Sequence, residues 1–134
     1  MPALTFVLMD PPFESERTAT GVRLIEAAIL QGFDVNVFAY EGAVSLAFAR
    51  QAKHANAVHG HDADAEDHPL PREWVARLLA LAAERGVKLD WVQCGLCVDE
   101  RGVGEAVPGT RRGSPVDLLN ASRASVSTLV IPAR

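Results

Sequence analysis

Leu4-Thr-Phe-Val-Leu-Met9 is the stretch that sets the fold class of this 134-residue chain, and Asp10-Pro11-Pro12 ends it. The run is almost continuously apolar and includes β-branched and aromatic residues, which is typical of a strand buried on both faces of a parallel sheet. Three further segments have the character of strands: 34–39, 87–94 and 126–131.

Apolar residues at helical spacing separate these strands. The spacing predicts helices over about 18–31, 43–53, 71–85 and 114–122, with Gly32 and Gly86 placed as C-terminal stops. Strands that alternate with helices imply a parallel sheet covered by helices. We therefore predict an α/β fold, in which a single-domain, mostly parallel sheet of about five strands is flanked by helices.

Composition excludes several classes of function. The net charge is −4 and Arg111-Arg112 is the only basic doublet, so the chain lacks the basic stripe of a nucleic-acid-binding protein. No apolar run approaches the ~18 residues of a membrane span. Residues 1–134 are expected to form one domain, with an acidic, histidine-containing loop at about 54–71. The opening residues lack the charged region of a signal peptide, so we expect a cytoplasmic protein.

Both cysteines of the chain lie in one segment, Cys94-Gly-Leu-Cys97-Val-Asp-Glu-Arg101-Gly102, directly after a predicted strand. Right-handed crossovers place the carboxyl ends of all parallel strands at one edge of the sheet, where open α/β sheets bind their ligands. The loops 10–17 and 40–42 reach the same edge. We therefore expect the functional site where these three segments meet.

A cysteine at a strand-to-helix turn can have its thiolate stabilised by backbone N–H groups, and Arg101 can add a positive charge. Such a thiolate can accept a sulfane sulfur as a persulfide, which the second thiol can resolve. Two alternatives stay open. The cysteines can be small buried hydrophobic residues, or they can bind a metal together with histidines such as His59 or His61. Gly102-Val-Gly104 lacks the third glycine of a dinucleotide fingerprint, so no cofactor is predicted.

The spacing Cys94-x-x-Cys97-x-Asp99-x-Arg101-Gly102 resembles the cysteine loop of the DsrE/DsrF/TusD-like sulfur-relay superfamily, particularly its YchN-like branch. The first loop is similar as well, with an aromatic residue followed by Ser-Glu. Segments 35–44, 72–89 and 113–131 also fit that family in order, so the resemblance covers most of the chain.

The resemblance implies a compact α/β domain that assembles as a homotrimer or homohexamer and exchanges sulfur with donor and acceptor proteins. It places the persulfide on Cys94, with Cys97 as a companion. Arg101, through its positive charge, is the third residue expected to be catalytic. Residues expected to bind the substrate come from the three loops at the sheet edge: Phe13, Glu14, Ser15, Tyr40 and Gly95. The alternative is a non-catalytic oligomeric scaffold or small-ligand-binding protein with the same fold.

Overall fold

A computed structural model describes the chain except for residues 1, 14, 56–57, 59, 65–67 and 134. Its five strands form one sheet: β1 (Ala3–Leu8), β2 (Asp34–Ala39), β3 (Leu89–Cys94), β4 (Thr110–Gly113) and β5 (Ser127–Ile131). The strand order is β4-β3-β2-β1-β5, and every neighbouring pair is parallel. This confirms the predicted single-domain α/β fold.

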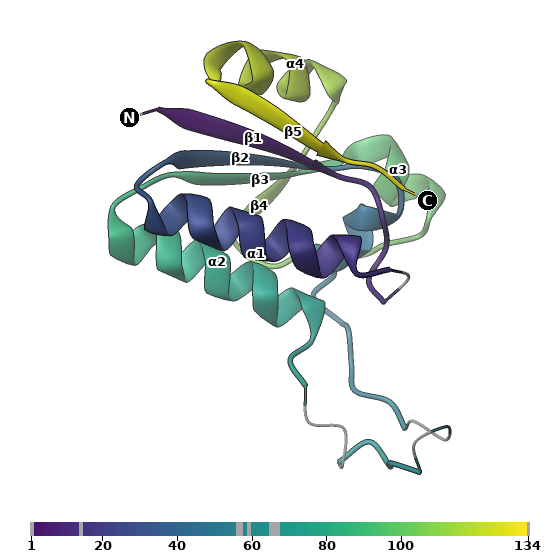
Figure 1. Ribbon diagram of the computed structural model, residues 1–134. Coiled ribbons are helices and arrows are strands. Elements are labelled where there is room, and N and C mark those ends of the chain that lie inside the picture. Colours follow the sequence, from purple (N-terminus) through teal and green to yellow (C-terminus); the bar gives the residue numbers. More distant parts are fainter. Residues whose placement is uncertain (1, 14, 56–57, 59, 65–67, 134) are drawn as a thin grey trace.

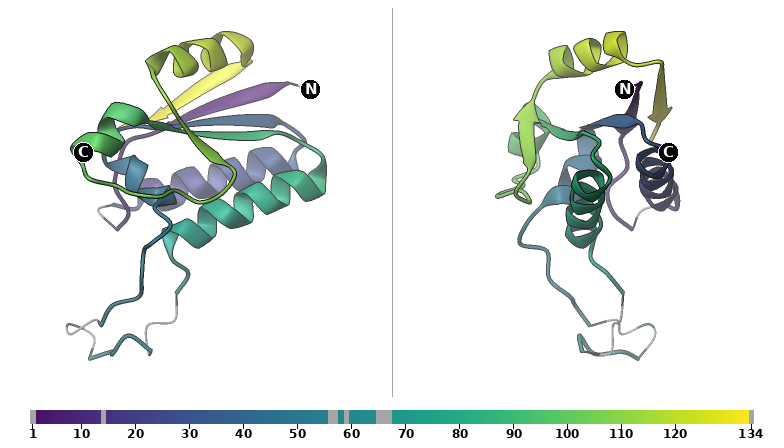
Figure 2. Two further views of the ribbon diagram at one scale, coloured as in Figure 1. Left: turned by 180° about the vertical axis from the view of Figure 1, so that it is seen from behind. Right: turned by 90° about the vertical axis from the view of Figure 1, so that its left-hand side faces the viewer.

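The helices lie on both faces of the sheet (Figures 1 and 2). They are α1 (Arg17–Leu30), α2 (Pro71–Arg85), the short α3 (Gly95–Glu100) and α4 (Pro115–Ala124). Helices α1 and α2 cover one face, and α4 lies over the other (Figure 1). No helix among the described residues is long and apolar enough to cross a membrane.

Successive side chains of a strand point to opposite faces of the sheet, so the core consists of two clusters, one on each face. The larger cluster fills the space under α1 and α2 and includes Phe6, Ile25 and Trp91. The smaller cluster lies on the opposite face, includes Val92, and contains both cysteines. The face that carries α4 is therefore the face on which the candidate site lies.

One local prediction was wrong, and one strand was missed. The helix expected over 43–53 is a 3₁₀ helix, η1 (Glu41–Ala47), after which Phe48 forms an antiparallel bridge with Ala106. None of the four strand segments recognised in the sequence covers 110–113, which forms β4. The four residues of β4 do not show the alternation of apolar and polar residues that is typical of a strand. They form one because they pair with the edge of β3.

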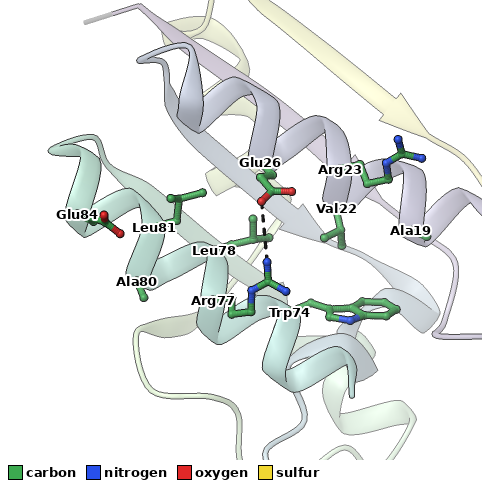
Figure 3. Close-up of a pocket in the computed structure, with 10 residues that line it drawn as sticks. All are labelled: Ala19, Val22, Arg23, Glu26, Trp74, Arg77, Leu78, Ala80, Leu81 and Glu84. Carbon is green, nitrogen blue, oxygen red and sulfur yellow. Dashed lines mark ion pairs between the residues drawn. The ribbon is translucent and has the colours of Figure 1, made fainter. Parts of the chain in front are cut away.

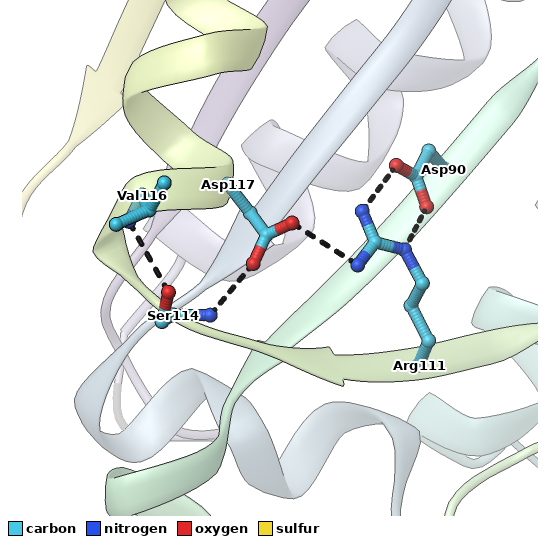
Figure 4. A network of polar contacts seen from close by, with 5 residues as sticks. All are labelled: Asp90, Arg111, Ser114, Val116 and Asp117. Carbon is cyan, nitrogen blue, oxygen red and sulfur yellow. Dashed lines mark hydrogen bonds and ion pairs between the residues drawn. The ribbon is translucent and has the colours of Figure 1, made fainter.

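A polar network ties β4 to its neighbours (Figure 4). Arg111 donates two hydrogen bonds to Asp90 on β3, at 3.0 and 2.9 Å, and one to Asp117 on α4, at 3.1 Å. Asp117 also accepts the backbone N–H of Ser114, the residue that caps α4. The network therefore connects β4 and α4 to β3, the strand that ends in Cys94.

The network makes a prediction about acid stability. The Ser114 N–H and then Arg111 lower the pKa of Asp117, so its contribution to stability is present above the unfolded pKa of about 4 and is lost as pH falls through the lowered folded pKa. We expect Asp117→Asn to melt below wild type at pH 7, and the two melting curves to converge at acidic pH. Melting temperatures from pH 2.5 to 7 measure this, with exposed Glu84→Gln as the control. A difference that stays constant across this range would contradict it.

Candidate functional site

The two thiols lie at the junction of β3 and α3. Cys94 is the last residue of β3 and the N-cap of α3, and Cys97 lies one turn into that helix. Both are buried, with 3% and 6% of their surface exposed, and they pack with Val7, Phe38 and Val92. They are buried because the inner face of α3 carries Cys97, whereas the polar residues Asp99 and Glu100 lie on its exposed face.

The surroundings of Cys97 keep its thiol neutral. Burial raises the pKa of Cys97 and the neighbouring Cys94 thiol raises it further, whereas the backbone N–H of Glu41 and the charge of Arg101 lower it to a smaller extent. Glu41 donates that N–H to the Cys97 Sγ at 3.3 Å. Its φ of 50° lies in the left-handed region, which is uncommon for a residue other than glycine. This strained turn holds the β2–η1 junction against the cysteine helix.

A hollow of about 600 Å³ opens beside this junction, at the carboxyl ends of β1 and β2. Asp10, Glu41 and Arg101 supply its charged groups. Asp10 is buried, and its carboxylate accepts a hydrogen bond of 2.5 Å from Ser15. The hollow thus has charges of both signs and borders on the residue whose N–H contacts Cys97.

The predicted substrate-binding residues do not all gather at this hollow. Tyr40 packs against the cysteine cluster, and Gly95 is buried at the start of α3. Phe13 is 64% exposed and lines a separate hollow with Phe48 and His54. Ser15 does not line the hollow itself, but its hydroxyl donates a hydrogen bond to Asp10, which does. Glu14 lies outside the described residues.

Sequence reasoning did not identify Arg112, although it is in direct contact with the cysteine helix. Its guanidinium donates to both carboxylate oxygens of Asp99, each at 3.0 Å, and to the carbonyl of Gly95 at 3.1 Å. Neighbouring strand residues face opposite sides of a sheet. Arg111 and Arg112 therefore have separate partners, a distinction that required β4 to be recognised as a strand.

A groove of about 420 Å³ lies between α1 and α2, on the face of the sheet opposite the cysteines (Figure 3). Val22 and Leu78 are among its apolar lining residues. A 4.0 Å ion pair between Glu26 and Arg77 crosses it. The pair is exposed and contributes little to stability. Among the described residues that line the groove there is no cysteine, serine or histidine. It is therefore separate from the candidate site.

Metal binding was the chemical alternative for the cysteines. Among the residues that the structure describes, no three His, Cys, Asp or Glu side chains are grouped so that they can hold a metal ion. His59 lies outside those residues. Cys94 and Cys97 therefore have no further ligand beside them within the described part of the site.

Comparison with known families gives a match over almost the whole chain. The profile of the DsrE/DsrF-like family matches residues 3–130. The chain belongs to the DsrE/DsrF-like family. This confirms the resemblance seen in the sequence.

Solved structures of this family fold are similar in shape at low sequence identity. The YchN protein of E. coli is 20% identical, with a TM-score of 0.70 over 97% of this chain and 99% of that one. A conserved protein of unknown function from Bacteroides thetaiotaomicron, BT1422, is 12% identical, with a TM-score of 0.55 over 96% and 93% of the two chains. The comparison with curated proteins gives no match. These similarities therefore extend to the fold and not to an activity.

Proposed function

We propose that this protein is a sulfur carrier that holds a persulfide on Cys94 and passes the outer sulfur to a partner protein. The Cys94 thiolate attacks the outer sulfur of a persulfide donor. A bond forms between the Cys94 Sγ and that sulfur, the donor S–S bond breaks, and the donor leaves as a thiolate with the electron pair. In the second step an acceptor thiolate attacks the outer sulfur and Cys94 leaves as the thiolate.

One observation carries this proposal: in a DsrE/DsrF-like fold, two adjacent thiols occupy the β3–α3 junction at the carboxyl edge of the sheet. The raised pKa of Cys97 makes this thiol a poor nucleophile, because a protonated thiol reacts slowly. Cys97 therefore competes weakly for the donor. It is also slow to attack the Cys94 Sγ, a reaction that would form a disulfide and release hydrosulfide.

Loading requires local movement, because the structure leaves little solvent at either thiol. The segment that has to move is short, since α3 has six residues. Leu96, between the cysteines, is 73% exposed and offers an apolar contact at the same place. We propose that docking of a donor or acceptor protein on this residue accompanies the opening.

The assignment predicts which thiol takes up sulfur. After incubation with a persulfide donor, wild type and Cys97→Ser should each gain the mass of one sulfur atom, and Cys94→Ser should gain none. Intact-protein mass spectrometry measures this, and treatment with a reductant should remove the added mass. If Cys94→Ser loads as wild type does, Cys94 is not the carrier.

The burial of both thiols in an apolar cluster favours a second candidate, a non-catalytic scaffold or ligand-binding protein of the same fold. The same experiment separates the two functions. A scaffold would load on neither cysteine, even with a large excess of donor, and would keep its thiols unreactive until it unfolds.

A further inference from the structure

Arg112 links β4 to the cysteine helix by three hydrogen bonds. Two of them go to Asp99, and the third goes to the carbonyl of Gly95, the residue after Cys94. A bidentate pair of this kind fixes the direction of the guanidinium as well as its distance. The position of this cation is therefore set relative to the turn that presents Cys94.

The guanidinium of Arg112 comes so close to position 95 that a side chain there would displace it by a few tenths of an ångström. A Cβ at Gly95 would lie 3.0 Å from the Arg112 Nη2, which is closer than nearly all such contacts in proteins. Gly95 thus leaves room for the guanidinium directly over the first residue of α3.

The guanidinium is also within electrostatic reach of Cys94. The pKa of Arg112 is raised first by its hydrogen bonds to Asp99 and then by the Asp99 charge, and Cys94 is among the smaller causes. Arg101, in contrast, acts on Cys97 and lines the neighbouring hollow. Arg112 is thus the arginine that is hydrogen-bonded to the turn after Cys94.

We infer that Arg112, held by Asp99 over Gly95, is the positioning cation of Cys94. This inference takes from the proposed function only that Cys94 is the reactive thiol. It replaces Arg101, the arginine that the sequence suggested, with a residue 18 positions from the cysteine that becomes its neighbour through the pairing of β4 with β3.

Several other titratable or charged groups border this part of the molecule, and each variant below changes only the one group that it names. They come from α3, the β1 and β2 ends, and α4: Cys97, Asp99, Arg101, Asp10, Tyr40, Glu41 and Asp117. Cys97→Ser serves as the common parent, so that Cys94 is the only thiol measured.

The test is the rate of alkylation of Cys94 by iodoacetamide from pH 5 to 10. Arg112→Gln removes the positive charge, so the midpoint of the pH profile should rise and the rate at pH 7 should fall roughly three- to tenfold. Asp99→Asn removes the opposing negative charge but keeps one acceptor oxygen for Arg112, which the Gly95 carbonyl also holds, so the midpoint should fall. Arg112→Lys, which keeps the charge, should lie between Arg112→Gln and the parent.

Arg112→Gln and Asp99→Asn break the same ion pair, so a purely structural role would shift the midpoint in the same direction in both variants. Opposite shifts therefore indicate that the charges beside Cys94 determine the midpoint. Arg111→Gln, which breaks the neighbouring network, should lower the melting temperature and leave the midpoint unchanged. Shifts of the same sign in Arg112→Gln and Asp99→Asn, no shift in either, or a larger shift in Arg101→Gln would overturn the inference. If Arg112→Gln does not fold, Asp99→Asn decides alone, and an unchanged or raised midpoint overturns it.

This readout is independent of sulfur transfer. Alkylation profiles that fail to shift leave the persulfide result for Cys94 untouched. Conversely, absence of persulfide loading leaves the effect of Arg112 on the thiol measurable.

Discussion

In solution, the protein should have three or six times the 14.4 kDa mass of its chain. The resemblance of the cysteine loop implies such an assembly, and exposed apolar side chains on α4 and β5 support the expectation. Helix α4 has no buried residue although it lies over the sheet. Four apolar side chains of this part of the chain are 51–68% exposed: Val116 and Leu119 on α4, Val126 just before β5, and Val130 on β5. Large exposed apolar surface marks association sites in folded proteins, and we expect a second copy of the chain to cover these side chains.

Charged substitutions on this surface should dissociate the assembly. Leu119→Glu combined with Val130→Asp should reduce the mass measured by light scattering three- to sixfold, to that of one chain. Leu30→Glu, at a similarly exposed apolar residue on α1, is the matched control and should leave the mass unchanged. Wild-type protein with the mass of a single chain at micromolar concentration would contradict the expectation.

Trp91→Ala should have the largest effect on stability of any single substitution discussed here. Trp91 lies on β3, is completely buried, and packs under α1 and α2. Truncation of a buried tryptophan leaves a cavity that the neighbours fill only in part, at a cost of about 3–5 kcal/mol in the free energy of unfolding. Urea unfolding followed by circular dichroism, at one fixed chain concentration, measures the loss.

Trp91→Phe separates the shape of the side chain from its polar group. The indole N–H of Trp91 has no hydrogen-bond partner within the described part of the chain, so phenylalanine removes an unsatisfied donor together with some volume. We expect its cost to be well below that of Trp91→Ala. Trp74→Ala, at a half-buried position on α2, is the control. A loss at Trp74 as large as that at Trp91 would show that burial under the two helices does not determine the effect.

The alternation of strands and helices could be predicted because its signals are local. Apolar runs marked four of the five strands, and residues at the helix ends marked where helices begin and stop. Ser114 caps α4 through its side chain, and Gly86 ends α2 with a φ of 71°. Each signal acts within a few residues and therefore survives in the sequence alone. Two helices were exceptions: the short α3 was not among the predicted ranges, and the extent of the 3₁₀ helix after β2 depends on the later pairing of Phe48 with Ala106.

The sequence by itself determined the α/β class, the parallel sheet and the position of Cys94 at the carboxyl edge, because periodicity and strand ends are properties of contiguous residues. Only the tertiary structure decided that β4 is a strand, that both thiols are buried, and that Arg112 contacts the cysteine helix. Each of these depends on contacts between segments that are distant in the chain, such as the pairing of Cys94 with Gly113 across β3 and β4. The energies of such contacts come from packing and pairing partners that no local pattern specifies.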